Sequence, residues 1–283
     1  MKQRIVLFLC LAMTLVSTKG QENIWQHTAC KAKVWLTPYL AQGQKRPAII
    51  VCPGGSYFWH DMKAEGKDVG AWLQRNGITA FVLRYRTAYV PAFVTHYRWI
   101  WRGNRYPDPQ DDLRQAIRYV KQHAERWNVD TTKIGAMGFS AGGHLVVSGG
   151  LFFAEHDRPA FIASLYPVVT MSAPCVHKRS RRALMGESRM RNHALRDALS
   201  LEKQVTSVCP PVFLANCIDD PIVDYRNAIL LDSALTAQHV PHVYYQYRTG
   251  GHGFGASETK GSAECRTWKQ SFLAWLSQLW KAK

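Results

Sequence analysis

A serine between glycines lies near the middle of the chain, where an apolar run meets a helical one. Residues 138–144 read Gly-Phe-Ser-Ala-Gly-Gly-His. This is the G-x-S-x-G pattern of a nucleophile elbow, in which the serine stands on a sharp turn from strand to helix. Glycines two positions before and after Ser140 leave room for that turn. Because a serine hydroxyl is a weak nucleophile until a histidine removes its proton, the pattern predicts a histidine and a carboxylate elsewhere in the chain.

Both partners follow later, at the ends of two apolar runs. Residues 212–217 lead into Asp219 and Asp220, and residues 243–247 lead into His252, which lies among glycines. The order serine, acid, histidine is the one that a nucleophile elbow needs. Side chains at the carboxyl ends of parallel strands project into one crevice. We therefore expect a triad in which His252 takes the proton and an aspartate holds its imidazole.

Either of the two adjacent aspartates could hold the histidine. Asp220 is favoured, because its spacing to Val223 fits the pattern D-x-x-V. Asp219 would then be a neighbouring hydrogen-bonding or capping group.

An oxyanion hole is the remaining requirement of acyl transfer, and backbone N–H groups can form it. The residue after the nucleophile, Ala141, supplies one of them. The other is expected in the loop 53–57, Pro-Gly-Gly-Ser-Tyr, which follows the apolar run 48–52, with Gly55 and Ser56 as the candidate donors. An ordinary Pro-Gly turn is the structural alternative.

These motifs together resemble the α/β-hydrolase superfamily, and within it the small secreted carbohydrate esterases called acetyl xylan esterase or acetylesterase, some of them misnamed xylanases. The resemblance extends over nearly all of residues 21–283. Its further segments are Leu83-Arg84-Tyr85-Arg86, Tyr106-Pro107-Asp108-Pro109-Gln110-Asp111, and Ser180-Arg181 with Leu184-Met185-Gly186.

The resemblance implies a serine esterase that removes small acyl groups, acetyl in the first place, from a plant polysaccharide or its oligosaccharides. No cofactor is expected, and no spacing of cysteines and histidines suggests a metal. Three alternatives stay open: a feruloyl esterase, a serine peptidase, and a carbohydrate-binding protein on an inactive hydrolase scaffold.

Short apolar runs alternate with longer amphipathic ones, which predicts an α/β fold with a mainly parallel central sheet and helices on both faces. The expected strands are 33–36, 48–52, 80–85, 133–139, 161–166, 212–217 and 243–247. Helices are expected at 63–76, ending before Gly77, and at 111–127. The aromatic stripe of the C-terminal helix, from Trp268 to Leu279, is expected to pack in the core.

Two segments depart from the family pattern and lie where a substrate pocket would be shaped. Residues 89–105 are long and aromatic, with Trp99 and Trp101 among arginines that could pair with uronate carboxylates. With Tyr57, these tryptophans are the candidate substrate-binding residues, and packing of a long loop is the alternative. Residues 177–196 are strongly basic and form either a cap over the serine or a solvated helical face.

Residues 1–20 are typical of a secretory signal peptide, because basic residues precede an apolar run that ends in small residues. We expect cleavage before Gln21, a periplasmic or extracellular protein with one catalytic domain, residues 21–283, and no transmembrane segment after cleavage. The net charge of the whole chain is +16. A basic surface attracts nucleic acid, anionic membranes or acidic polysaccharides, and an exported protein rarely meets nucleic acid. The sequence does not predict an oligomeric state.

Six cysteines follow the signal peptide, and an oxidising compartment permits disulfides. Sequence alone does not choose among the pairings. Cys175 and Cys209, which flank one excursion, are the favoured pair. Cys52 and Cys217 end apolar strands, where a cysteine is more often a small buried apolar residue.

Overall fold

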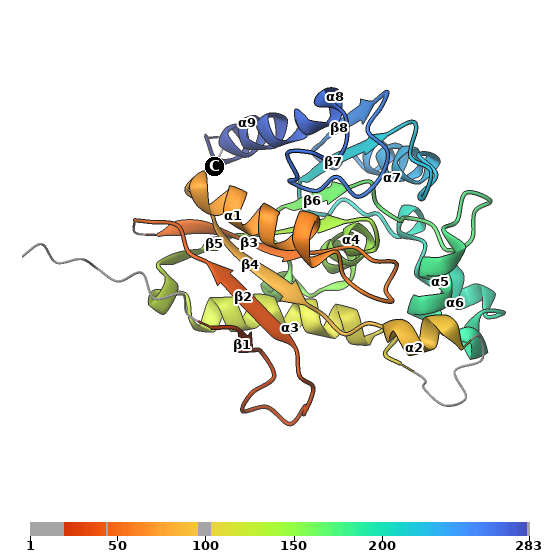
Figure 1. Ribbon diagram of the computed structural model, residues 1–283, viewed down its shortest axis with the longest axis horizontal. Helices are drawn as coiled ribbons and strands as arrows, with labels where there is room; N and C mark the ends of the chain where they lie inside the picture. The colour runs from red at the N-terminus through yellow and green to blue at the C-terminus, as the bar shows by residue number, and fades with distance from the viewer. Residues whose placement is uncertain (1–19, 44, 96–102, 282–283) are drawn as a thin grey trace, which may run out of the picture.

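The computed structural model describes residues 20–43, 45–95 and 103–281, and a single twisted sheet runs through them (Figure 1). Its strands are β1 (Glu22–Asn23), β2 (Trp35–Tyr39), β3 (Arg46–Cys52), β4 (Thr79–Arg84), β5 (Val129–Phe139), β6 (Ile162–Leu165), β7 (Val212–Cys217) and β8 (His242–Tyr247). Their order across the sheet is β1-β2-β4-β3-β5-β6-β7-β8. The strands from β3 to β8 are parallel, whereas β2 pairs antiparallel with β4, and β1 with β2.

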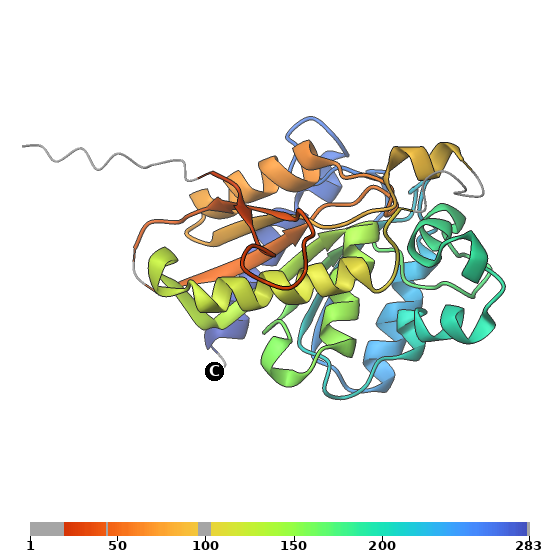
Figure 2. The same ribbon diagram turned by 90° about the horizontal axis from the view of Figure 1, so that it is seen from below.

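Helices cover both faces of this sheet (Figures 1 and 2). One face packs against α1 (Asp68–Arg75) and α9 (Trp268–Lys281), and the other against α3 (Asp108–Gln122), α4 (Ala141–Phe152) and α7 (Arg226–Ala237). Successive side chains of a strand point to opposite faces. Accordingly, Ile49 and Val51 of β3 pack with α1 and α9, and Ile50 and Cys52 with α3 and α4. The predicted α/β fold is confirmed.

The aromatic stripe of α9 lies in the core, as predicted. Trp268 and Phe272 are fully buried, and the ring of Trp268 lies 5.0 Å from that of Trp72 in α1. The indole N–H of Trp268 also donates to the carbonyl of Gly255 at 2.9 Å. Packing of the C-terminal helix therefore reaches the loop that follows β8.

The helix expected at 63–76 has an irregular start. Residues Met62–Lys67 form a π-helical turn. Asp61 caps this turn by accepting the N–H groups of Lys63 and Ala64. α1 continues from this turn, and Gly77 follows it with a φ of +75°. A π-helical turn is a rare element that often marks a functional site.

The helix expected at 111–127 is shifted toward the N-terminus. It begins at Asp108, because Pro109 suits the first turn of a helix, and it ends before His123. Only a short 3₁₀ turn, Glu125–Trp127, continues beyond it. The two-residue strand β1 was not predicted, since so short a strand shows no alternation of apolar and polar residues.

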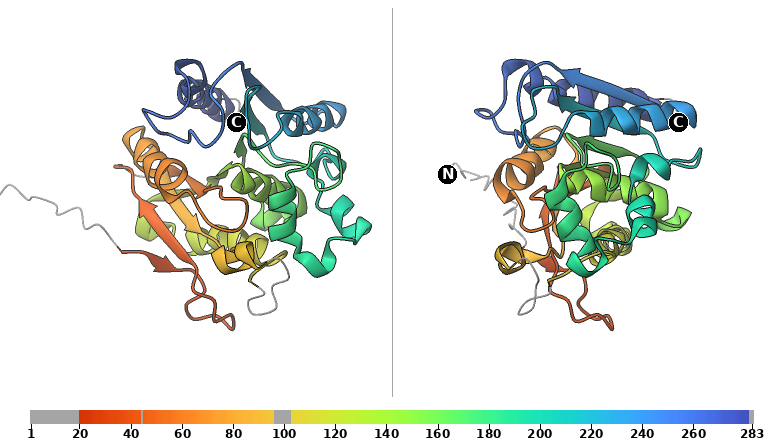
Figure 3. Two further views of the ribbon diagram at one scale, coloured as in Figure 1. Left: turned by 45° about the vertical axis from the view of Figure 1, so that its right-hand side comes forward. Right: turned by 90° about the vertical axis from the view of Figure 1, so that its right-hand side faces the viewer.

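Two excursions meet beyond the carboxyl ends of the parallel strands (Figure 3). One carries α2 (Tyr89–Val94), and the other carries α5 (Lys178–Met185) and α6 (His193–Ala198). Arg182 donates to the carbonyl of Phe93 at 2.7 Å, and Arg189 donates to the carbonyl of Tyr106 at 3.0 Å. The basic segment 177–196 is therefore more than a solvated face, because its arginines fix it to the neighbouring excursion.

The predicted disulfide between Cys175 and Cys209 is wrong, since both thiols are free. The backbone carbonyl of Cys175 is held by Asn227 of α7, whereas Cys209 is buried just before β7, and burial raises the pKa of its thiol to about 12. The excursion between these two cysteines contains α5 and α6, and its two ends do not bring the thiols together. Cys52 and Cys217 are fully buried, as predicted.

The predicted signal peptide, residues 1–20, lies outside the described residues except for Gly20. Among the described residues, no helix has the length and apolar character needed to cross a membrane. A short helix, α8 (Ala263–Arg266), precedes α9.

Candidate active site

Ser140 stands on a tight turn between β5 and α4. Its backbone has φ 54° and ψ −118°, a conformation that residues other than glycine rarely adopt. A Cβ on Gly138 would lie 2.0 Å from the carbonyl oxygen of Gly142, and one on Gly142 would lie 2.0 Å from that of Cys52. Only glycine fits at these two positions, and this close packing holds Ser140 in its strained conformation.

The structure brings Ser140, His252 and Asp220 together. Nε2 of His252 lies 2.9 Å from Oγ of Ser140, and Nδ1 lies 2.6 Å from Oδ2 of Asp220. Because Asp220 accepts the proton on Nδ1, Nε2 is free to accept the serine proton. The side chain of Asp220 is 1% exposed and that of His252 13%, so water has little access to either contact.

The two adjacent aspartates have different partners. Oδ1 of Asp220 accepts the N–H groups of Ile222 and Val223 at 2.8 and 2.9 Å, which fixes the carboxylate toward the histidine. Asp219 instead accepts the N–H groups of Gly250 and Gly251 at 3.1 and 2.8 Å. One aspartate therefore orients the imidazole, and the other holds the loop that carries it.

The candidate oxyanion donors lie beside the serine. Within the described residues, no acceptor takes the N–H of Gly55, Ser56 or Ala141. A Cβ on Gly54 would lie 2.8 Å from Cβ of Ser140, which places this loop directly against the nucleophile. These free N–H groups are suited to a developing negative charge on an oxygen bound beside Oγ.

A buried glutamate that sequence reasoning missed connects the two loops of the site. Glu65 lies in the π-helical turn and is 2% exposed. Its carboxylate accepts the N–H of Gly54 at 2.6 Å and the hydroxyl of Tyr166 at 2.9 Å. The same hydroxyl accepts the N–H of Gly255 at 3.0 Å, and the ring of Tyr166 lies 4.7 Å from that of His252.

The neighbours of Glu65 orient its carboxyl group. Burial raises the pKa of Glu65, and His252 and the hydrogen bonds from Gly54 and Tyr166 offset only part of this rise. Glu65 does not reach Oγ of Ser140. It therefore positions the loops around the serine.

Tyr57 lies in the interior, so its predicted contact with substrate has to be corrected. Its side chain is 1% exposed, and its hydroxyl donates to Nδ1 of His144 at 2.9 Å. Positive φ values at Ser56 and Tyr57 turn the chain so that the phenol points beneath the loop. The other predicted substrate-binding residues, Trp99 and Trp101, lie outside the described residues.

A second histidine lies near the site. Nδ1 of His177, before α5, is 2.8 Å from Oγ of Ser180. Burial, with a smaller effect of His252 and Arg179, lowers the pKa of His177 to about 4. His177 is therefore neutral near neutral pH and adds no charge beside His252.

Comparison with known proteins places this site in a family. The BD-FAE family model matches residues 37–235. The chain belongs to the BD-FAE family. The solved structure of an acetyl ester-xyloside bifunctional hydrolase from Caldicellulosiruptor lactoaceticus is 30% identical with a TM-score of 0.82, covering 94% of this chain and 98% of that one. The predicted resemblance to α/β-hydrolase esterases is confirmed.

Two curated relatives of this BD-FAE chain are longer. The acetylxylan esterase of Xylanibacter ruminicola is 29% identical over 249 residues, which are 87% of this chain and 49% of the relative. Endo-1,4-beta-xylanase B of Butyrivibrio fibrisolvens is 30% identical over 251 residues, 82% of this chain and 37% of the relative. The chain thus spans less than half the length of these relatives.

Replacement of Glu65 should impair both folding and esterase activity. Glu65→Ala leaves the buried Gly54 N–H and Tyr166 hydroxyl without their acceptor, and each such loss costs about 1–3 kcal/mol. Glu65→Gln keeps one acceptor and should be milder in both respects. Urea unfolding and kcat/KM on a small aryl acetate measure the two effects. Glu155→Gln, at an exposed glutamate, is the matched control. Wild-type values for Glu65→Ala would contradict the positioning role.

The fold should lose stability in acid partly through His144. Its Nε2 donates to the carbonyl of Leu199 at 2.9 Å while Nδ1 accepts from Tyr57, so only the neutral ring satisfies both contacts. Burial lowers the pKa of His144 to about 4. Because the unfolded chain takes up this proton near pH ~6.5 and the folded chain only near pH 4, stability falls as pH drops through this window.

The measurement is the free energy of unfolding in urea at several pH values. In His144→Gln, the loss between neutral pH and the pKa of the buried ring should be smaller than in the wild type by up to about 3 kcal/mol. His27→Gln, at an exposed histidine, should leave the pH dependence as it is. Equal slopes for wild type and His144→Gln would refute this source of acid sensitivity.

Proposed function

We propose that this chain is an exported serine esterase that removes small acyl groups, in the first place acetyl, from a plant polysaccharide or its oligosaccharides. The observation that carries the proposal is the hydrogen-bonded chain from Ser140 through His252 to Asp220, with Oγ to Nε2 at 2.9 Å and Nδ1 to Oδ2 at 2.6 Å. The names of the acetylxylan esterase and the acetyl ester-xyloside hydrolase support acetyl as the acyl group.

The reaction follows from the geometry of these groups. His252 removes the proton of Ser140 as Oγ attacks the ester carbonyl, and the resulting oxyanion accepts N–H groups of Ala141 and of the loop at Gly55 and Ser56. His252 then gives this proton to the sugar oxygen as the bond between that oxygen and the acyl carbon breaks, so the sugar leaves as an alcohol. Water, deprotonated by the same histidine, attacks the acyl-enzyme and releases the acid. Asp220 keeps the imidazole in the required tautomer and stabilises its charged form.

The proposed triad predicts a graded series of variants. Ser140→Ala should fold normally and lose kcat on a small aryl acetate by roughly four to six powers of ten, because no other hydroxyl replaces the nucleophile. Asp220→Asn should lower kcat by about 10⁴, because the amide favours the wrong tautomer. Asp219→Asn should have a much smaller effect, since it weakens only the contacts with Gly250 and Gly251.

Circular dichroism and steady-state kinetics check this series, and Ser188→Ala, an exposed serine outside the site, is the control. Retained activity in Ser140→Ala would overturn the mechanism. A larger loss in Asp219→Asn than in Asp220→Asn would exchange the roles of the two aspartates. A fluorophosphonate probe should label the wild type and spare Ser140→Ala, whereas a catalytically inactive carbohydrate-binding scaffold would not react at all.

The substrate is tested by the acid released from natural esters. We expect acetate from acetylated xylan at a kcat/KM well above that for methyl ferulate. A feruloyl esterase is the second candidate, because Phe58, Trp59 and Phe93 form an aromatic cluster next to the oxyanion loop, with ring centroids 5.3–6.1 Å apart. Preferential release of ferulic acid would establish that alternative. Peptide cleavage without ester cleavage would support the serine peptidase.

A further inference from the structure

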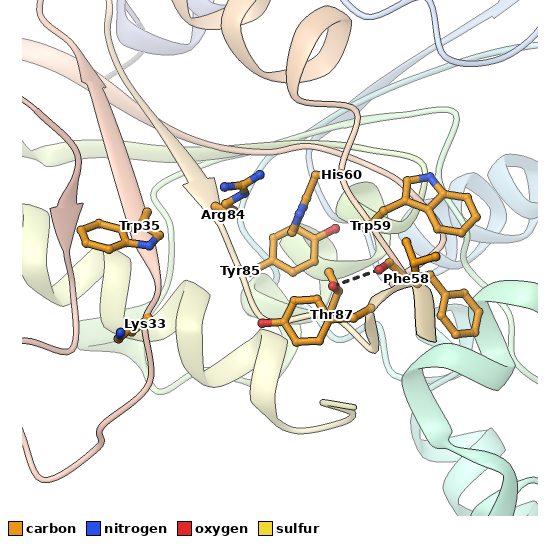
Figure 4. Close-up of a pocket in the computed structure, with 10 residues that line it drawn as sticks. Lys33, Trp35, Phe58, Trp59, His60, Arg84, Tyr85 and Thr87 are labelled. Atoms are coloured by element: carbon orange, nitrogen blue, oxygen red, sulfur yellow. Dashed lines mark hydrogen bonds between the residues drawn. The ribbon is translucent and has the colours of Figure 1, made fainter. Parts of the chain in front are cut away.

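A cavity of about 380 Å³ opens beside the oxyanion loop (Figure 4). It lies between the start of β2, the end of β4 and the segment after Tyr57. The residues that matter for its chemistry are Lys33, Trp35, Trp59, His60, Arg84 and Tyr85. Its size falls within the range of small-ligand sites, which is about 300–1,000 Å³.

The cavity combines aromatic rings with two unpaired cations. Figure 4 shows Trp35 and Lys33 on one side, Trp59 on the other, and Arg84 with His60 and Tyr85 between them. In the part of the chain that the structure describes, neither Lys33 nor Arg84 makes a side-chain hydrogen bond or an ion pair, and no carboxylate lines the cavity. Two positions further along, Arg86 is by contrast bonded to Asp108 and Asp112.

His60 adds a polar group without charge. Burial, with a smaller effect of the charge on Arg84, lowers the pKa of His60 to about 3. The ring is therefore neutral over the usual working range, and its Nε2 has no hydrogen-bond partner among the described residues. The positive charge of the cavity comes from Lys33 and Arg84, and its sign selects an anion.

The cavity lies on the same edge of the sheet as Ser140. Arg84 ends β4 and pairs with Trp35 of the antiparallel strand β2, so both residues lie at the carboxyl edge of the parallel strands. β4 is two strands from β5, which leads into Ser140, and two strand spacings amount to roughly 10 Å. The backbone of Trp59 packs against Gly55, since a Cβ there would lie 2.3 Å from the carbonyl oxygen of Trp59.

Trp59 also faces the second excursion. The guanidinium of Arg179 lies 6.0 Å from the centre of its ring, and Arg179 in turn is close enough to His177 to lower its pKa. A basic and aromatic surface thus runs from the neighbourhood of His252 to Arg84. An extended polymer with its ester at Ser140 can follow this surface into the cavity.

We propose that this cavity binds a carboxylate-bearing sugar, a uronic acid unit of the polysaccharide whose ester lies at Ser140. Trp35 and Trp59 offer apolar faces to the sugar ring, and Lys33 and Arg84 pair with its carboxylate. The identity of the polymer rests on the proposed esterase function, whereas binding of the acidic sugar does not require Ser140.

Binding is measured by calorimetry on the Ser140→Ala protein with three probes. These are a xylo-oligosaccharide with a glucuronic acid branch, an oligogalacturonate, and the neutral xylo-oligosaccharide. We expect an acidic probe to bind at least about tenfold more tightly than the neutral one, with an affinity that falls as NaCl rises. The two acidic probes distinguish a xylan from a pectin as the source of the uronate.

Substitutions in the cavity assign the binding. Arg84→Gln and Lys33→Gln should each weaken acidic probes about tenfold or more without changing the neutral one, and Arg84→Lys should fall in between. Lys31→Gln, an exposed lysine outside the cavity, is the matched control and should bind as the parent does. Equal affinity for acidic and neutral probes, or unchanged affinity in both glutamine variants, would overturn the proposal.

Activity separates this proposal from the esterase function. In an otherwise wild-type protein, Arg84→Gln and Lys33→Gln should leave kcat/KM on an aryl acetate unchanged and raise KM only for acetylated oligosaccharides that carry a uronate. If the wild-type protein binds acidic probes, Arg84→Gln weakens that binding and no ester is hydrolysed, the uronate site stands and the proposed esterase function is refuted. The reverse result, active esterase without acidic preference, would refute only the uronate site.

Discussion

The site depends on one close backbone contact, that of Gly142 against the carbonyl of Cys52. A Cβ at Gly142 would lie 2.0 Å from that oxygen, so the first turn of α4 touches the end of β3 directly. This contact fixes both the strained turn at Ser140 and the loop that follows Cys52. A φ of 54° costs about 1–3 kcal/mol and persists only where the surroundings over-determine it. Here the buried parallel strands on both sides of the turn do so.

Glu65 extends this rigidity to the loop that carries His252. A buried carboxylate is costly unless hydrogen bonds satisfy it, and both oxygens of Glu65 have a donor. Asp219 holds the N–H groups at the start of the same loop, and Trp268 holds the carbonyl of Gly255 at its end. The glycine-rich sequence of this loop predicts flexibility, but hydrogen bonds hold the loop at several points. They keep the imidazole within reach of Ser140.

The residues of the central constellation could be predicted because their chemistry fixes their order and places them at strand ends. Glu65 could not, since an acidic residue in an amphipathic helix normally faces water. Its burial depends on Tyr166, which is 101 residues away in the chain. Tyr57 was misplaced for a related reason, because the side on which a loop residue points is set by local φ values that composition does not reveal. The prediction of a Cys175–Cys209 disulfide was wrong because two cysteines that flank the same excursion in the sequence need not lie close enough in space to form a bond.

The charged groups around the site form two sets, the carboxylates near His252 and the arginines of the excursions above them. Near His252, the buried carboxylates of Glu65 and Asp220 accept backbone or hydroxyl donors, which fixes their orientation. The exposed Asp219 accepts backbone donors of the loop that carries His252. On the excursions above them, Arg181, Arg182 and Arg189 donate to the carbonyls of Met171, Phe93 and Tyr106. Arg182 also pairs with Glu187 at 3.7 Å. A carbonyl fixes the guanidinium of Arg181 or Arg189 without cancelling its charge, so these two arginines keep the rim basic. A basic rim raises the local concentration of an anionic polymer. Of the three carboxylates, Asp220 contacts the imidazole, whereas Glu65 and Asp219 hold the loops around it.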